Sequence, residues 1–281
     1  MRMVGLTDAQ RSLLDEWLGA WEVTADYSWP LQDTVVLHVR AGRGSYIVKA
    51  SRTSHHIIRE IAAHEQFLGK FAAWTPRLVR SSAPERLLVT EYLPGVLVEG
   101  TEAEWDPETY RQAGARLREL LVPGAISDDY LVRLIESARR SIVAAIGLVE
   151  SSQLVQLDEL LSSARAGPVA LSFTHGDYQP RNWLMDNGVL RVIDFGRAAQ
   201  RHWTSELVRL HSQQFVGHEA LKHAFFSGLE RQLTAEDSEV FRLERIQQAV
   251  GTVVWANGIN DASFEEQGRE MIRTVLREPR R

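Results

Sequence analysis

The 281-residue sequence contains no cysteine. This absence excludes disulfide bonds, thiolate nucleophiles, and zinc or iron–sulfur sites held by cysteine. The first ten residues, MRMVGLTDAQ, lack the apolar core of a secretory signal, and no run of 18 apolar residues occurs anywhere. We therefore expect a cytoplasmic protein with no membrane association.

Lysine is also scarce, since only Lys49, Lys70 and Lys222 occur among the 32 basic residues. The formal net charge of -5 favours neither nucleic acid nor an anionic membrane as a partner, and no obligatory protein partner is evident. Mild acidity does suit a cationic small molecule. Because arginine serves as the generic cation in this chain, a lysine inside a predicted strand stands out.

The first third of the chain shows strand and helix patterns in turn. Thr7 and Gln10 form a capping box before a helix predicted over residues 8–18. Alternating apolar residues then predict an antiparallel sheet, with a PLQD turn after its first strand, and a helix crosses between its third and fourth strands. The predicted strands cover residues 21–29, 34–40, 45–50, 77–81 and 86–93, and the helix covers 55–69.

After Pro94-Gly95 the pattern is mainly helical. Helices are predicted over residues 107–121, over 128–166 with a break near Gly147, and from Trp203 nearly to the end, with a strand at 169–173. The sequence therefore predicts an α+β protein of two lobes. A small antiparallel-sheet lobe with one key helix would occupy residues 1–93, and a larger, mostly helical lobe residues 94–281.

The segment WLMDNGVLRVI, residues 183–193, predicts a hairpin around Asn187-Gly188. A two-residue turn pairs Asp186 with Val189 and places Asn182 opposite Ile193. Asp194 would then lie beside Asn182 at the open end of the ribbon, close enough for both side chains to bind one cation.

Asp177 precedes this hairpin in the loop THGDYQPRN. A carboxylate there could accept the proton of a substrate hydroxyl while a metal holds a phosphoryl donor. Asp177, Asn182 and Asp194 each also suit a turn or a strand end when taken alone. Their combined spacing favours a metal and phosphate site.

These motifs resemble the aminoglycoside phosphotransferase family, small-molecule kinases with the protein-kinase-like fold. The matching residues are His175, Gly176, Asp177 and Asn182, followed by Ile193, Asp194, Phe195 and Gly196. The resemblance implies that Asp177 is the catalytic base and that Asn182 and Asp194 bind Mg²⁺. It implies ATP or GTP as the phosphoryl donor.

The predicted small lobe carries the rest of the resemblance. Lys49 matches the strand lysine that contacts nucleotide phosphates, and Glu60 matches its helix partner, with Glu65 as the alternative. LLVTEYLPG resembles the hinge, whose backbone around Thr90, Glu91 and Tyr92 would bind the base. His175 is expected to position the loop, and His55 and His56 are expected to face solvent.

The departures from protein kinases concern the acceptor. SWPLQDT, the first hairpin turn, has no glycine, Gln179 stands where Ser/Thr kinases usually carry lysine, and A-P-E does not follow D-F-G. Without a peptide platform, a small-molecule acceptor fits better. Glu206 is the nearest match to the family's loop-bracing Asp.

The resemblance implies transfer of the γ-phosphate to a hydroxyl of a cationic antibiotic, either an aminoglycoside or a basic cyclic peptide of the capreomycin or viomycin type. The alternatives are a metabolic kinase for choline, homoserine, a ketosamine or a thio-sugar, and a non-catalytic nucleotide-binding regulator. The candidate acceptor residues are Asp261, Glu265, Glu266, Trp203 and Trp255, although a solvated helix start also explains the acidic ones.

Overall fold

The computed structural model describes residues 5–29, 33–164 and 167–278. The chain divides into two compact units. Unit 1 comprises residues 1–113 and 175–199, and unit 2 comprises residues 114–174 and 200–281. This division differs from the expected boundary at residue 93, because residues 94–113 and the segment 175–199, which holds the catalytic loop and the hairpin, both belong to the N-terminal unit.

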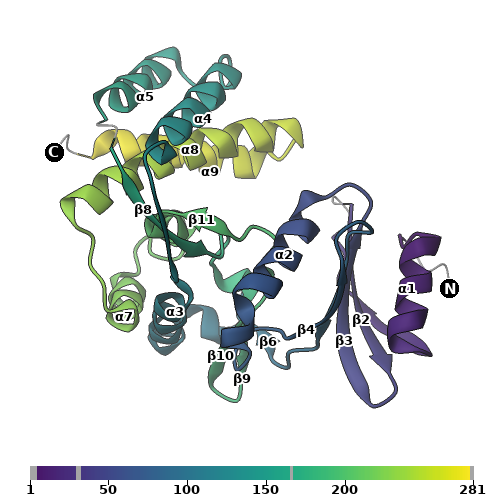
Figure 1. Ribbon diagram of the computed structural model, residues 1–281. Helices are drawn as coiled ribbons and strands as arrows, with labels where there is room; N and C mark the ends of the chain where they lie inside the picture. Colours follow the sequence, from purple (N-terminus) through teal and green to yellow (C-terminus); the bar gives the residue numbers. More distant parts are fainter. Residues whose placement is uncertain (1–4, 30–32, 165–166, 279–281) are drawn as a thin grey trace. The chain divides into compact units, whose positions relative to one another are not determined.

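Unit 1 is built on a five-stranded antiparallel sheet with the strand order β1-β2-β3-β5-β4 (Figure 1). All five predicted strands are present within a few residues of their expected bounds. Helix α1 (Asp8–Leu18) begins at the predicted capping box of Thr7 and Gln10. The strands are β1 (Trp21–Asp26), β2 (Thr34–Ala41), β3 (Gly44–Ser51), β4 (Leu78–Ser82) and β5 (Leu87–Glu91).

The two faces of this sheet carry different helices. One face packs Leu37, Val48 and Ala50 against Leu14 of α1 in a buried apolar cluster. On the other face, Leu88 packs against Ile57 and Ile61 of helix α2 (His55–Gln66), which is followed by a 3₁₀ turn, η1 (Leu68–Phe71). Because side chains alternate along a strand, Lys49, which lies between Val48 and Ala50, points toward the α2 face.

A second, three-stranded sheet completes unit 1, with the strand order β10-β9-β6. Strands β9 (Trp183–Asp186) and β10 (Val189–Val192) form the predicted hairpin, and β6 (Val96–Leu97), which the sequence did not predict, pairs with β9. Val192 also donates its N–H to the carbonyl of Trp74 at 2.9 Å. These bonds explain why the hairpin belongs to unit 1.

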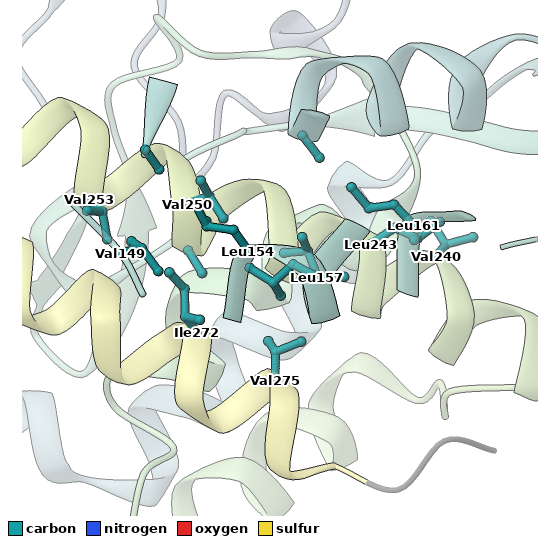
Figure 2. Close-up of a cluster of buried hydrophobic side chains, with 14 of the residues drawn as sticks. Val149, Leu154, Leu157, Leu161, Val240, Leu243, Val250, Val253, Ile272 and Val275 are labelled. Carbon is teal, nitrogen blue, oxygen red and sulfur yellow. The ribbon is translucent and has the colours of Figure 1, made fainter. Parts of the chain in front are cut away.

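Unit 2 is mostly helical. Its apolar core joins α4, α5, α8 and α9 through side chains such as Leu157, Val250 and Ile272 (Figure 2). From residue 98 onward, the described elements of unit 1 outside the hairpin are η2 (Glu102–Trp105), the first half of α3 (Pro107–Leu120) and η3 (Pro180–Asn182). Those of unit 2 are the rest of α3, β7 (Pro123–Ser127), α4 (Tyr130–Ala144), α5 (Ser151–Ser163), β8 (Val169–Thr174), β11 (Ala199–Arg201, whose first residue is the last of unit 1), η4 (Trp203–Glu206), α6 (Leu207–Ser212), α7 (Glu219–Leu229), α8 (Ala235–Gly258) and α9 (Ala262–Arg277).

The predicted helix over residues 128–166 is two helices, α4 and α5, and Gly147 lies in the break between them with φ +84°. Strands β7 and β11 flank β8 in a third sheet, and both were missed because each is short and lacks apolar alternation. The first three residues of the predicted PLQD turn, 30–32, lie outside the described residues. In the described part of the chain, no helix is long and apolar enough to cross a membrane.

Candidate active site

The hairpin has the register that its turn predicts. Asp186 pairs with Val189, and Ile193 donates its N–H to the carbonyl of Asn182 at 3.0 Å. Asn187 and Gly188 both have positive φ, +49° and +79°, as a type I′ turn requires. Asp194 follows directly with φ +67°, so the pairing ends at the residue that the resemblance assigns to the metal.

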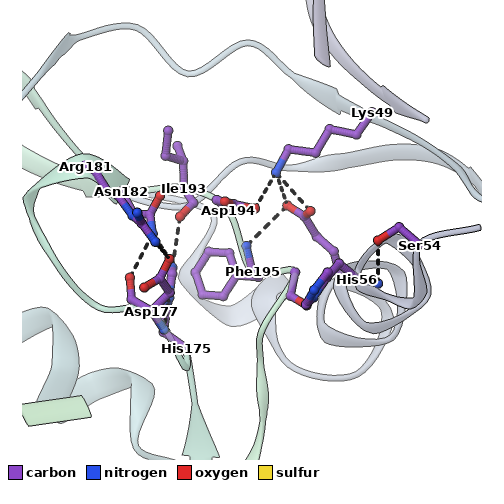
Figure 3. A network of polar contacts seen from close by, with 12 residues as sticks. Lys49, Ser54, His56, His175, Asp177, Arg181, Asn182, Ile193, Asp194 and Phe195 are labelled. Atoms are coloured by element: carbon purple, nitrogen blue, oxygen red, sulfur yellow. Dashed lines mark hydrogen bonds and ion pairs between the residues drawn. The ribbon is translucent and has the colours of Figure 1, made fainter. Parts of the chain in front are cut away.

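Lys49 links the sheet, helix α2 and the D-F-G segment within unit 1 (Figure 3). Its Nζ donates to both carboxylate oxygens of Glu60 and to Oδ1 of Asp194, each at 2.9 Å. The Glu60 side chain is only 4% exposed, whereas that of Asp194 is 52% exposed. Glu65, the alternative partner, instead accepts a hydrogen bond from Ser81.

The charges in this cluster depend on one another. Burial opposes the charge of Lys49, yet the nearby carboxylates of Asp194 and Glu60 raise its pKa above the ordinary value. The positive charge of Lys49 holds the pKa of Asp194 well below its usual range. Burial raises the pKa of Glu60, and Lys49 acts against that rise. The site therefore combines a cationic lysine with an ionised Asp194.

The Asp177 carboxylate is buried and held by its own loop. Oδ1 accepts from Gln179 Nε2 at 2.5 Å, and Oδ2 accepts from Arg181 Nη2 at 2.7 Å and from Asn182 Nδ2 at 3.2 Å. These three donors fix the orientation of both carboxylate oxygens. The contacts of Gln179 and Arg181 with Asp177 were not predicted from the sequence, although both residues lie within four positions of it.

His175 connects the catalytic loop with the segment that follows the hairpin. Its Nε2 lies 2.9 Å from the Ile193 carbonyl, and its Nδ1 accepts from the Asp177 N–H at 3.2 Å. A carbonyl can only accept, so the proton is on Nε2. His175 is thereby a loop-positioning residue, and its ring also packs against Phe195.

The oxygen donors fit Mg²⁺, which usually takes one or two protein ligands and completes its shell with phosphate and water. The Asn182 amide group uses Nδ2 to bond the carbonyl and carboxylate of Asp177, which leaves its Oδ1 for a cation. Asp194 supplies a half-exposed carboxylate. No group of three or more His, Cys, Asp or Glu side chains that could hold a metal occurs among the described residues.

The predicted hinge follows β5. The N–H groups of Glu91 and Tyr92 are used within unit 1, because they donate to the carbonyls of Arg77 and Ser45 at 2.9 Å. Thr90 is buried within the sheet. Glu91 and Tyr92 can therefore offer a nucleobase only their carbonyls. The N–H of Leu93 makes no backbone hydrogen bond within the described residues, so it is the better candidate donor.

Three aromatic rings stack within unit 1. Tyr92 was named from the sequence as a hinge residue, but its stacking on His38, and that of His38 on Tyr27, were not predicted. His38 stacks on Tyr92 with ring centroids 4.2 Å apart, and Tyr27 lies parallel to His38 at 6.5 Å. His38 pairs with Ile47, which is two residues before Lys49 on β3. The stack therefore lies on the face of the sheet that carries Lys49.

The acceptor candidates lie in unit 2, where most are already engaged. Asp261 caps α9 by accepting from the Phe264 N–H at 3.0 Å. Glu265 and Glu266 pair with Arg269, and Glu266 also pairs with Arg273. These contacts are those of a solvated helix start. Trp255 is 48% exposed and meets Phe264 edge to face.

Trp203 does not offer the expected stacking face. The ring is 1% exposed, its Nε1 donates to Asp237 at 2.7 Å, and the Arg231 guanidinium lies 4.2 Å from its centroid. This tryptophan packs η4 against α8 within unit 2, so its ring is not accessible to an acceptor. Glu206 is also buried in unit 2, where its charge acts on Glu244.

Comparisons with known proteins identify the family. No curated protein sequence matches this chain. The fold is similar to a thermostable mutant of aminoglycoside phosphotransferase APH(4)-Ia, in ternary complex with ADP and hygromycin B, with a TM-score of 0.68, 14% identity, and coverage of 96% of this chain and 98% of that one.

Two further structures have other acceptors in their names. Macrolide 2'-phosphotransferase MphH from Brachybacterium faecium has a TM-score of 0.60, 18% identity and 98% coverage of both chains. Choline kinase LicA from Streptococcus pneumoniae has a TM-score of 0.65, 14% identity, and coverage of 95% of this chain and 96% of that one. At these identities the likeness confirms the predicted protein-kinase-like fold.

The family follows from the sequence match. The model of the family described as APH, phosphotransferase enzyme family, matches residues 25–240. That range covers most of the chain and includes the catalytic loop and the D-F-G segment, and it confirms the resemblance found in the sequence. This protein is an enzyme that belongs to the phosphotransferase enzyme family.

Proposed function

We propose that this enzyme transfers the γ-phosphate of ATP or GTP, in the presence of Mg²⁺, to a hydroxyl of a small molecule. The observation that carries the proposal is the network in unit 1 that ties Lys49 to Glu60 and Asp194, beside the loop in which Asn182 binds Asp177. Each residue has the chemistry that its proposed role requires.

Asp177 is the proposed base. Gln179, Arg181 and Asn182 fix its carboxylate, which orients the acceptor hydroxyl and takes its proton. Lys49 orients the nucleotide phosphates, and Glu60 holds Lys49 in place. Asn182 and Asp194 would hold Mg²⁺, which when bound neutralises charge on the phosphates. Such catalysis depends mainly on positioning and electrostatic stabilisation.

For the nucleobase, we propose the segment that follows β5, with the carbonyls of Glu91 and Tyr92 and the N–H of Leu93. The stacked rings of His38 and Tyr92 would limit the space for the base. Thr90 would contribute to nucleobase binding indirectly, because its pairing within the sheet holds the start of this segment in place.

The leading acceptor class is a cationic antibiotic, in keeping with the family and with the net charge of -5. The engaged carboxylates of Asp261 and Glu265 give this class no specific support. The similarity to choline kinase favours a metabolic alcohol as the second candidate. Phosphorylation of an antibiotic would inactivate it and give resistance. We place the protein, and with it either activity, in the cytoplasm.

Asp177→Ala and Asp177→Asn test the proposal. Each variant is expected to lower kcat by about 10²- to 10⁴-fold while nucleotide affinity changes little, since a base acts on the transferred proton and not on the nucleotide. A panel of aminoglycosides, basic peptide antibiotics, macrolides and choline would identify the acceptor. Retention of kcat by both variants would refute the role of Asp177, and absence of nucleotide binding in the wild type would refute the function.

A further inference from the structure

We propose that His56 is a positioning residue for the Asp194 carboxylate, an inference that rests on the proposed function. His56 is the second residue of α2. The sequence suggested that both histidines at this helix start face solvent, and His55 does. His56 is instead half-buried and contacts the D-F-G segment within unit 1 (Figure 3).

The contact of His56 with Gly196 is both polar and steric. His56 Nδ1 lies 2.9 Å from the Gly196 carbonyl oxygen, and since a carbonyl can only accept, Nδ1 is the donor. A Cβ atom added to Gly196 would lie 3.3 Å from the Cβ of His56 and 3.6 Å from its carbonyl oxygen. The first turn of α2 and Gly196 therefore lie in direct contact.

Gly196 transmits this contact to Asp194. A Cβ atom added to Gly196 would also lie 3.5 Å from Oδ1 of Asp194, so this one residue lies against His56 on one side and against the Asp194 carboxylate on the other. Asp194 has φ +67°, a left-handed conformation that is uncommon for residues other than glycine, although Asp adopts it more often than most. Such a conformation persists only where the surrounding structure holds it.

Two residues of α2 hold the segment from Asp194 to Gly196. Glu60 Oε1 accepts from the Phe195 N–H at 3.3 Å, and His56, one helical turn earlier on the same side of α2, bonds Gly196. Lys49 holds the Asp194 side chain itself. Loss of His56 would leave Lys49 and Glu60 in place and would remove the anchor at Gly196. Asp194 would then be less well ordered for Mg²⁺.

A matched set of variants tests this role. His56→Asn keeps a donor near the position of Nδ1, whereas His56→Gln places its amide near the position of Nε2 and His56→Ala has no donor. The exposed His55 ring lies 4.3 Å from the His56 ring, so His55→Ala removes this ring contact, keeps the donor at position 56 and serves as the control. Gly196→Ala disturbs the same contact from the other side, because its methyl group would press on His56.

The measurements are the Mg²⁺ concentration at half-maximal ADP binding, by calorimetry, and amide hydrogen exchange at Phe195 and Gly196. We expect His56→Ala, His56→Gln and Gly196→Ala to raise that Mg²⁺ concentration by about three- to tenfold, the range that one hydrogen bond provides, and to speed exchange at both amides. ADP affinity without Mg²⁺ should not change. His56→Asn should stay within about twofold of the wild type.

The outcomes separate the two proposals. If the wild type binds ADP with Mg²⁺ and the His56 variants behave like His55→Ala, the positioning role is wrong and the proposed function stands. If His56→Asn is as impaired as His56→Gln, the hydrogen bond to Gly196 is not the cause, which also refutes the role. If the wild type shows no Mg²⁺-dependent ADP binding, both proposals fail. Should His56→Ala not fold, the comparison of Asn with Gln decides.

Discussion

Lys49 donates a hydrogen bond of 2.9 Å to Asp194, although the two residues stand 145 positions apart in the sequence. The same ammonium group bonds both carboxylate oxygens of Glu60. One lysine ammonium is thus shared between a buried carboxyl group, Glu60, and a half-exposed ionised carboxylate, Asp194. The exposed carboxylate of Asp194 is the one that a divalent cation could bind.

Removal of one partner of the Lys49–Glu60 pair should destabilise the folded protein strongly. Lys49→Met leaves a buried carboxylate without its partner, so we expect the free energy of unfolding to fall by about 3–5 kcal/mol. Lys49→Met combined with Glu60→Gln should recover part of that loss, since no buried charge then remains. Urea unfolding of the two single variants and the double variant measures the coupling. Strictly additive losses would contradict a coupled buried pair.

The ion pair between Asp194 and Lys49 should weaken only at low pH, where Asp194 becomes protonated. Because Lys49 lowers the pKa of Asp194 below its ordinary value of 3.8, the folded state gains stability from this group above pH 3.8 and loses it as the pH falls further. Asp194→Asn removes the titration. We expect its Tm to lie below that of the wild type at pH 7, with the difference shrinking below pH 4. A Tm difference that stays constant from pH 7 to pH 3 would show that the ion pair does not contribute.

Much of the site could be predicted from the sequence because it depends on short-range rules. The Asn187-Gly188 turn determines the hairpin register, and the register places Asp194 one residue beyond the Ile193–Asn182 bond. Lys49 was identifiable because lysine is rare in this chain, and Glu60 because the family pattern favoured it over Glu65.

What the sequence could not predict are contacts between segments distant in sequence. Strand β6 is two residues long, and it exists because β9 provides a pairing edge. The bond from His56 to Gly196 joins a helix start to a loop 140 positions later, and no periodicity encodes it. Trp203 was misread as a stacking surface, since aromatic composition does not distinguish a buried ring from an exposed one.

Unit 2 contains a buried acid whose titration should oppose folding near neutral pH. Burial raises the pKa of Glu244 to about 8, although Tyr130 and Thr204 both donate to its carboxylate at 2.7 Å. A raised folded-state pKa means that the folded chain binds the proton more tightly, so stability falls as the pH rises from about 4.5 toward 8. Glu244→Gln removes this dependence.

We therefore expect the Tm of Glu244→Gln, relative to the wild type, to rise steadily between pH 5 and pH 8. The buried histidines His202 and His211, whose pKa values burial lowers to about 4, are present in both proteins and cancel in the difference. Calorimetry in buffers of matched ionic strength measures it. A Tm difference that stays constant from pH 5 to pH 8 would mean that Glu244 is ionised throughout this range and is stabilised by its two donors.

Arg181 should act on catalysis through Asp177. Its Nη2 bonds Asp177 Oδ2 at 2.7 Å, and the guanidinium is 42% exposed whereas the carboxylate is 6% exposed. Arg181→Ala removes a charge-assisted bond that fixes the proposed base, so we expect kcat to fall by about three- to tenfold with unchanged nucleotide affinity. Arg181→Lys should retain more activity.

Arg111→Ala is the matched control, because Arg111 also pairs with an acid a few residues away but lies on an exposed helix surface. Steady-state kinetics of the three variants with the same acceptor distinguishes an effect on the orientation of Asp177 from a general effect of surface charge. An increase in kcat on removal of Arg181 would contradict the prediction. It would mean that the guanidinium competes with the acceptor hydroxyl for Oδ2, so that Gln179 and Asn182 alone suffice to orient Asp177.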